Sequence, residues 1–382
     1  MAAPAQGEAL SRPLAIVNTQ IYHSEVVMGT LDALRPLAPR TAVYVHPRVE
    51  EGKDGLRDVV RRMYPGDLLR IPPRNSTDFV AGHKVAFFIS PGNSPEYTRF
   101  FINASRPHTV VLMIHNADDP NLPRLMAMHS RIRLVALSPH VVAALQRRGF
   151  EATWWLAAWP AYAGCPTLRN GTVREPWGFA CQGRIDSRRR SYDTLWAELK
   201  RAVETEEAAA AARARAKSKG GAAAAAKLAV PPPAPRLKIL GRLVKPDMEL
   251  PVPSAVRRLV TMVTYAPYKQ FFNYIACSHA LLPLFANESY LTTKFSSTVL
   301  ASLSTETPVL ADRAFLAAYT FLDERSIYLQ AEGEGLVAAM QRVQAMPAAE
   351  HAARRSALAL LRDKLNAAAR AFLEGLLAEA GG

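Results

Sequence analysis

Short apolar runs alternate with amphipathic segments along the first half of the chain. The first run, residues 14–18 (LAIVN), is continuously apolar, which is typical of a strand buried on both faces of a parallel sheet. Similar runs follow at residues 41–46, 85–90, 109–115, 134–138 and 152–156. Segments with apolar residues at helical spacing lie between them, the first from about Glu25. This alternation predicts a doubly wound α/β domain over residues 12–160.

The pattern restarts after residues 161–177, a stretch rich in Pro, Gly and Asn that is typical of a linker. Apolar runs recur at residues 178–182, 237–240, 259–264, 280–284, 308–311 and 327–329. They predict a second doubly wound domain over residues 178–334.

Two segments differ from this pattern. Residues 204–235 are alanine-rich, then basic, then proline-rich, which predicts a low-complexity insertion that is helical at first and then a disordered loop. Residues 335–380 are predicted to be helical, because apolar residues recur on one face at helical spacing. These residues are Leu358, Leu361, Leu365, Phe372 and Leu376.

The composition narrows the kinds of partner. A length of 382 residues exceeds what one hydrophobic core organises, which agrees with two domains. The net charge of +14 favours anionic partners, either a phosphorylated small molecule or an acidic membrane face in peripheral association. No nucleic-acid partner is expected, because the basic residues are not interleaved with aromatic residues on one element. No apolar window is long enough to cross a membrane.

Cysteines and asparagines bear on the cellular compartment. Cys165, Cys181 and Cys277 are odd in number and lack metal-ligand spacing, so they imply no disulfide framework. Three cysteines still permit a single disulfide. Four of the ten asparagines begin an Asn-x-Ser/Thr sequon, namely Asn75, Asn103, Asn170 and Asn287. The sequons favour a secretory lumen, whereas the first residues lack a signal-peptide pattern. We therefore expect the ER or Golgi lumen if an anchor precedes this chain, and the cytoplasm otherwise.

The stretch from Tyr290 to Leu322 carries the most specific chemistry. Ser296 or Ser297 is placed to cap a helix, and Lys294 comes just before them. A helix N-terminus with hydroxyls and a cation is suited to bind an anion, and ligands of open α/β sheets lie outside the carboxyl ends of the strands. The stretch therefore predicts a phosphate site. The alternative is an ordinary helix–strand unit whose lysine is solvated.

Several segments resemble the two-Rossmann-domain (GT-B) glycosyltransferases. Residues 183–185 (GRI) and the basic cluster after them resemble the Gly-Arg-Leu…Lys signature of the donor domain, with Arg189 in the place of the lysine. Residues 237–242 (LKILGR) resemble the second donor-domain strand with its glycine turn, and residues 305–310 (TETPVL) resemble the segment that ends in Pro-Val. In the first half, residues 134–145 resemble the last helix-bearing unit of the acceptor domain.

This resemblance implies an α/β fold with two doubly wound Rossmann-like domains facing a cleft, and a long C-terminal helix. It implies metal-independent transfer of a sugar from a nucleotide-sugar donor to a hydroxyl of a glycan, glycoprotein or small-molecule acceptor, without a tightly bound cofactor. The residues expected to hold the donor diphosphate are Arg184, Arg189, Lys294, Ser296 and Ser297.

Two histidines follow predicted strands of the first half. His23 lies in the first loop, and His115 ends the run at residues 109–115. Imidazole can accept a proton near neutral pH, and members of the resembled family often place a histidine at one of these positions, so both are predicted to be catalytic. The alternative is a hydrogen-bonded structural histidine. Tyr265, Tyr268 and Phe271 are candidates for stacking on a nucleotide base, although core packing fits their helical spacing better.

One departure from the family pattern concerns acidic residues. Many retaining members carry two glutamates eight residues apart near the final helix, and the matching positions here are Thr293 and Ala301. Glu288 and Glu306 are close in sequence but are not obvious replacements. The departure leaves open a catalytically inactive protein that binds sugar or nucleotide. A sugar-nucleotide epimerase has the same layout and is the other alternative.

Overall fold

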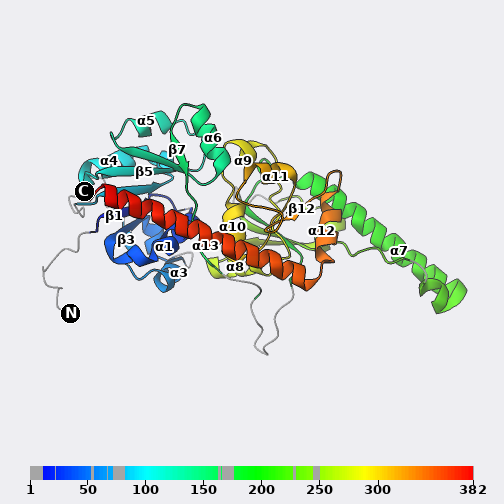
Figure 1. The fold of residues 1–382 in the computed structure, drawn as a ribbon. Helices are drawn as coiled ribbons and strands as arrows, with labels where there is room; N and C mark the ends of the chain where they lie inside the picture. The colour runs from blue at the N-terminus through cyan, green and yellow to red at the C-terminus, as the bar shows by residue number, and fades with distance from the viewer. Residues whose placement is uncertain are drawn as a thin grey trace. The chain divides into compact units, whose positions relative to one another are not determined.

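The computed structural model describes residues 12–21, 23–52, 56–66, 68–71, 82–161, 165, 176–226, 229–243 and 250–381. The chain divides into two compact units, and Figure 1 shows their helices and strands. Unit 1 comprises Met1–Pro160, Leu291–Phe295 and Leu361–Gly382, and unit 2 comprises Ala161–Tyr290 and Ser296–Leu360. Most of the residues predicted to form the linker lie outside the described residues.

Unit 1 is built on a seven-stranded parallel sheet with the order β3-β2-β1-β4-β5-β6-β7 among its described residues. This order is that of a Rossmann sheet, in which the winding direction reverses between β1 and β4. The strands are β1 (Leu14–Asn18), β2 (Thr41–Val45), β3 (Leu68–Arg70), β4 (Val85–Ile89), β5 (Thr109–Ile114), β6 (Ile132–Ala136) and β7 (Ala152–Trp154). Every residue of β1, β2, β4 and β5 is buried, which explains their continuously apolar sequences.

Helices connect these parallel strands. They are α1 (Ser24–Ala33), η1 (Arg35–Arg40), α2 (Pro47–Glu50), α3 (Leu56–Met63), η2 (Pro91–Asn93), α4 (Pro95–Ser105), α5 (Leu122–Met126) and α6 (Pro139–Arg147). The end of the chain completes unit 1, because the Nε1 of Trp155 donates a hydrogen bond to the carbonyl oxygen of Ala369 at 3.1 Å.

Unit 2 contains a parallel sheet of order β10-β9-β8 and a parallel pair β11-β12. The strands are β8 (Phe179–Ile185), β9 (Leu237–Leu243), β10 (Val260–Thr264), β11 (Leu310–Ala311) and β12 (Tyr328–Leu329). The prediction of a strand over residues 280–284 is wrong in extent. Among these residues only Leu281 forms β-bridges, to Ala180 on one side and Val309 on the other. Pro283 lacks an N–H group and Leu284 has a φ of 46°, so strand geometry cannot continue.

Two glycines face each other across β8 and β9. Gly183 pairs with Gly241 in the register of the two strands. A Cβ atom added to Gly241, whose φ is 157°, would lie 1.7 Å from the carbonyl oxygen of Gly183. The close approach of the two backbones therefore requires glycine. The two glycines also allow β8 and β9 to continue to Ile185 and Leu243. The sequence had predicted a loop after residue 182 and a glycine turn at Gly241.

The helices of unit 2 include the segment predicted to be a low-complexity insertion. They are η3 (Ser254–Leu259), α8 (Tyr268–Ala276), α10 (Ser297–Thr305), α11 (Arg313–Ala318), α12 (Leu336–Gln344) and α7 (Tyr192–Ala226), and α9 (Ser289–Thr292) precedes α10. α7 extends well into the alanine-rich tract, which agrees with the high helix propensity of alanine. The described proline-rich end is not a detached loop, because Gln341 Nε2 donates to the carbonyl oxygens of Pro232 and Pro233.

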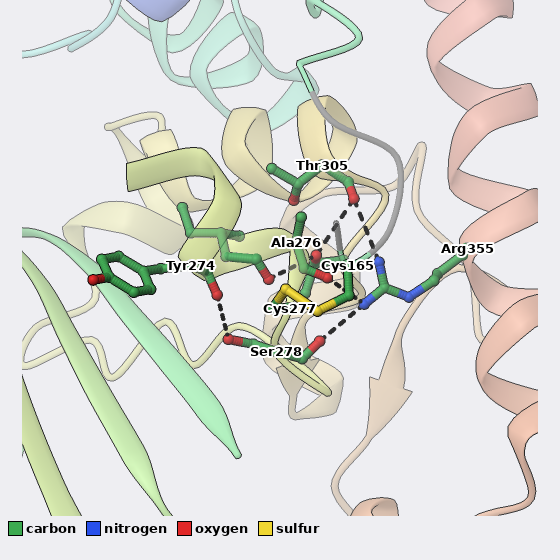
Figure 2. The surroundings of a disulfide bond; sticks show 9 residues. Cys165, Tyr274, Ala276, Cys277, Ser278, Thr305 and Arg355 are labelled. Carbon is green, nitrogen blue, oxygen red and sulfur yellow. Dashed lines mark hydrogen bonds between the residues drawn. A yellow bond between two sulfur atoms is a disulfide. The ribbon is translucent and has the colours of Figure 1, made fainter. Parts of the chain in front are cut away.

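A disulfide between Cys165 and Cys277 joins the predicted linker to the end of α8. Figure 2 shows Arg355 beside it, donating to the carbonyl oxygens of Ala276 (3.0 Å) and Ser278 (2.9 Å). Burial lowers the pKa of the Arg355 guanidinium, although three hydrogen-bonded carbonyl groups compensate part of its desolvation. The single disulfide that the cysteine count permitted is therefore present.

Arg355 belongs to α13 (Ala348–Glu379), the long helix near the end of the chain. Leu358, Leu365 and Leu376 are buried on it, as their helical spacing predicted, whereas Leu361 and Phe372 of the same predicted face are only half-buried. Among the described helices, none combines the length and the apolar character needed to cross a bilayer.

Candidate functional site

In unit 2, Gln182 joins the sheet to the start of α10. Its Nε2 donates to the hydroxyl oxygens of Ser297 (3.2 Å) and Thr298 (3.3 Å). Gln182 is buried in β8 and is followed directly by Gly183 and Arg184. These contacts hold the N-terminus of α10 against β8, the strand that also carries the exposed Arg184 two residues further on.

The N-terminus of α10 has the cap that the sequence predicted. The side chain of Ser296 accepts a hydrogen bond from the N–H of Thr298 at 3.3 Å, and Ser297 begins the helix. The hydroxyl of Tyr319 accepts from the N–H of Ser296 at 3.0 Å and donates to the carbonyl oxygen of Tyr290 at 2.9 Å. Burial raises the pKa of Tyr319, so its hydroxyl stays protonated. The helix therefore presents a positive dipole end with the half-buried Ser297 in its first turn.

Arg190, in the basic cluster after β8, has a structural role. Its Nη2 donates to the carbonyl oxygen of Gln182 at 2.8 Å, and its Nη1 donates to that of Pro283. The guanidinium is buried and lies over the ring of Phe285 at 5.8 Å. Arg190 thus ties the end of β8 to the neighbouring chain segment, a role that the sequence did not distinguish within the run of three arginines.

The other arginines of this cluster differ in their partners. Arg188 forms an ion pair with Asp186 (Nη2–Oδ2 3.0 Å), and this hydrogen bond lowers the pKa of Asp186. Arg184 and Arg189 are both exposed, and Arg189 interacts with Asp186 only through its charge, without an ion pair or a side-chain hydrogen bond within the described part of the chain. Among Arg184 in β8 and the three arginines that follow this strand, Arg184 and Arg189 are therefore the ones most open to an anionic ligand.

Lys294 belongs to unit 1, whereas the other residues predicted to hold a diphosphate belong to unit 2. Lys294 forms an antiparallel bridge with Asn116, and the N–H of Phe295 donates to the carbonyl oxygen of His115 at 2.9 Å. The Nε2 of His140 lies 3.0 Å from the carbonyl oxygen of Lys294. These contacts fix the backbone of Lys294 beside the end of β5. The residue is half-buried, and its amine has no partner among the described residues.

His23 and His115 lie ring against ring in unit 1. Their centroids are 4.2 Å apart, with 45° between the ring planes. His23 precedes α1 with a left-handed φ of 64°, and His115 follows β5. The Nε2 of His115 is buried and has no hydrogen-bond partner in the described part of the chain. The structure therefore brings both predicted catalytic residues together at the carboxyl edge of the sheet.

Burial also sets the charge of this pair. It lowers the pKa of His23 to about 4, and it lowers the pKa of His115 well below the ordinary value, with the neighbouring His23 as a second cause. Both imidazoles are therefore neutral at neutral pH. A neutral imidazole can accept a hydrogen bond from a hydroxyl group and donate one from its other nitrogen.

The positions where many family members carry glutamates are occupied differently here. The carbonyl oxygen of Thr293 accepts from the N–H of Ala117 at 2.8 Å, and Ala301 is buried inside α10. Glu306 caps the C-terminus of α10, so the length of a nine-residue helix, about 13 Å, separates it from Ser297. Glu306 therefore cannot replace a carboxylate at the helix N-terminus. Among the described residues, no group of three or more His, Cys, Asp or Glu side chains could hold a metal ion.

Two of the residues at this site were not found from the sequence. Gln182 and Arg190 lie within the segment that resembles the donor-domain signature, yet each has a partner that is distant along the chain. The contact between Gln182 and Ser297 spans 115 residues. Only the folded sheet brings such residues together, and local sequence carries no signal for them.

Solved structures of glycosyltransferases share this fold over nearly the whole chain. HepE from Anabaena, solved in complex with UDP and glucose, has a TM-score of 0.62 at 12% identity, covering 96% of this chain and 99% of HepE. The lipopolysaccharide outer core galactosyltransferase WaaB has a TM-score of 0.53 at 12% identity, covering 94% of this chain and 99% of WaaB. Sucrose-phosphate synthase from Thermosynechococcus elongatus has a TM-score of 0.50 at 13% identity, covering 96% and 98%.

No protein-family model matches the sequence, and no curated protein sequence matches it. The likeness to solved structures therefore establishes the architecture. With its Rossmann-type sheet, its second parallel sheet and its long C-terminal helix, the chain has the fold of the GT-B glycosyltransferases.

Proposed function

We propose that this protein is a glycosyltransferase that uses a nucleotide-sugar donor without a metal ion. The observation that carries the proposal is the capped N-terminus of α10, held by Gln182 against β8, the strand that also carries the exposed Arg184. A helix dipole, a serine hydroxyl and a guanidinium at one strand end suit the diphosphate of such a donor. UDP and UDP-glucose in the crystals of HepE make a UDP-sugar the first donor to test.

The leaving diphosphate must be stabilised as its charge develops. We assign this task to Arg184, Ser297 and the N–H groups of α10, with Arg189 as a second guanidinium. Ser296 supports them by capping the helix. Lys294 is proposed as a further cation on the donor, and its fixed backbone would limit the entropy lost on binding.

The nucleotide base needs an apolar platform. Tyr265 follows β10, is 54% exposed and has a φ of 56°. β10 is two strands away from β8, about 10 Å at the usual strand spacing. That separation suits the distance between a diphosphate and its base, so we propose that Tyr265 stacks on the base.

The acceptor hydroxyl must lose a proton in an inverting reaction. We propose that the unpaired Nε2 of His115 binds a sugar hydroxyl and that His23 orients the ring. A strongly lowered pKa makes His115 a weak base in the free protein.

Nucleotide binding can be tested by thermal shift with UDP, GDP and ADP. A nucleotide at 100 times its Kd should stabilise the protein by about 2.7 kcal/mol. The Arg184→Ala and Lys294→Ala variants should lose most of this stabilisation. Arg188→Ala is the matched control, because it removes the same charge from a side chain already paired with Asp186. A folded protein that responds to none of the three nucleotides would contradict the proposal.

The second candidate function is a catalytically inactive sugar or nucleotide-binding protein, favoured by Thr293 and Ala301 at the positions of the family glutamates. Release of nucleotide from UDP-sugars separates the two, since it needs no known acceptor. Release that is lost in Arg184→Ala supports the enzyme. A thermal shift without any release, over all donors tried, supports the inactive protein. Conversion of one UDP-sugar into another would instead indicate an epimerase.

A further inference from the structure

Two of the four sequons lie on described residues, and both present an exposed asparagine. Asn103 is exposed on α4, and Asn287 is exposed in the loop before α9. Asn75 and Asn170 lie outside the described residues. An attached glycan is large and hydrated, so a folded protein can carry one only where the asparagine side chain reaches solvent.

The loop at Asn287 has the geometry of a usable sequon. Ala286, Asn287 and Glu288 are all exposed. The N–H of Ser289 donates to the Oδ1 of Asn287 at 3.1 Å, and the Ser289 hydroxyl donates to the same oxygen. These bonds form a tight turn that occupies the amide oxygen. The Nδ2 atom makes only a 3.4 Å hydrogen bond, to the carbonyl oxygen of Arg188, and remains at the surface.

The sequon at Asn103 is built differently. It lies within the last turn of α4, and Ser105 is buried with its hydroxyl bonded to the carbonyl oxygen of Phe101 at 2.7 Å. The hydroxyl of Ser105 therefore bonds to the helix backbone, whereas the hydroxyl of Ser289 bonds to the asparagine of its own sequon.

The disulfide gives independent evidence for the compartment. Cys165 and Cys277 are bonded within unit 2 and close a sequence separation of 112 residues. Cys181 remains a buried thiol with 1% of its surface exposed, so it does not compete for either partner. Disulfides persist in oxidising compartments such as the ER lumen, where chains also meet the machinery of N-glycosylation.

From these observations we infer that Asn287 carries an N-linked glycan, added in the secretory lumen where the Cys165–Cys277 bridge forms. In this step the Nδ2 of Asn287 attacks the anomeric carbon of an oligosaccharide carried on a lipid diphosphate. The bond between that carbon and the diphosphate oxygen breaks, and the lipid diphosphate leaves with the electron pair. Nδ2 loses one proton to the transferase. The inference does not depend on the proposed function.

The test uses the full-length protein purified from its own cells. Its peptides are treated with peptide N-glycosidase in ¹⁸O-labelled water, which converts a glycosylated asparagine into labelled aspartate. We expect residue 287 as labelled aspartate in most molecules. Recovery of unmodified Asn287 as the only form would overturn the inference.

A pair of variants confirms the position. Expressed in the same cells, Ser289→Ala destroys the sequon and should lose the electrophoretic shift of one glycan. Ser289→Thr preserves the sequon and should keep that shift. Equal mobility of the two variants, before and after glycosidase treatment, would assign any glycan to another asparagine and refute the inference for Asn287.

Discussion

At the scale of single residues, buried imidazoles couple stability to pH in unit 2. The rings of His279 and His351 are 5.2 Å apart, and the Nδ1 of His279 is buried without a partner among the described residues. Burial lowers the pKa of His279 to about 4 and also lowers that of His351. The folded protein therefore holds both rings in the neutral form at pH values where the unfolded chain is already protonated.

Protonation of His279 destabilises the folded protein, so its free energy of unfolding falls as the pH falls. The stability due to neutral His279 is complete above pH 6.5, the pKa of an ordinary histidine, and is lost as the pH falls toward 4. We expect a loss on the order of 2 kcal/mol over this window, measured by urea unfolding. His279→Phe removes the titrating group without breaking a hydrogen bond at Nδ1, so it should flatten the profile. An unchanged slope between pH 6.5 and 4 would contradict this account.

Tyr265 is the residue proposed to stack on the nucleotide base. If its ring stacks on the base, Tyr265→Ala should weaken nucleotide binding by about 1–3 kcal/mol, the usual contribution of such stacking. Tyr265→Phe keeps the ring and should bind like the unaltered protein. Calorimetric titration with UDP measures both. Equal affinities for all three proteins would exclude the stacking role.

At the scale of elements, the facing glycines of β8 and β9 decide how far these strands run. Gly241→Ala places a Cβ atom 1.7 Å from the carbonyl oxygen of Gly183, so the two strands must separate. We expect a cost of roughly 2–4 kcal/mol in the free energy of unfolding. Gly375→Ala in α13 is the matched control, since nothing lies within 4 Å of the added atom. It should be neutral or stabilising by about 0.5–1 kcal/mol.

The elements also show what the sequence can and cannot predict. The strands β1, β2, β4 and β5 were predicted within one residue at each end, because burial on both faces imposes continuous apolar runs. β3 was missed, since its three residues are half-buried or exposed and carry no such pattern. The cap at Ser296 was predictable because it is a local hydrogen bond. Arg190 was not, because its carbonyl partner on Pro283 is 93 residues away.

At the scale of the whole molecule, the disulfide should stabilise unit 2. Cys165 and Cys277 are 112 residues apart, and closing a loop of about 100 residues removes up to about 4.7 kcal/mol of unfolded-state entropy in the loop-closure model. Cys165→Ser should therefore lower the melting temperature of the oxidised protein. Dithiothreitol should lower that of the unaltered protein to a similar value and leave the variant unchanged. A variant that melts at the oxidised temperature would show that the bridge contributes little.

The three-segment composition of unit 1 has a consequence for synthesis on the ribosome. Trp155 packs under α13 through its bond to Ala369, which is 214 residues later in the chain. At roughly 5–20 residues per second, about 10–40 s pass between the synthesis of these two residues. During that time the apolar face around Trp155 has no covering helix. Unit 1 therefore begins before unit 2 in the chain and is completed after it, once residues 361–381 have been made.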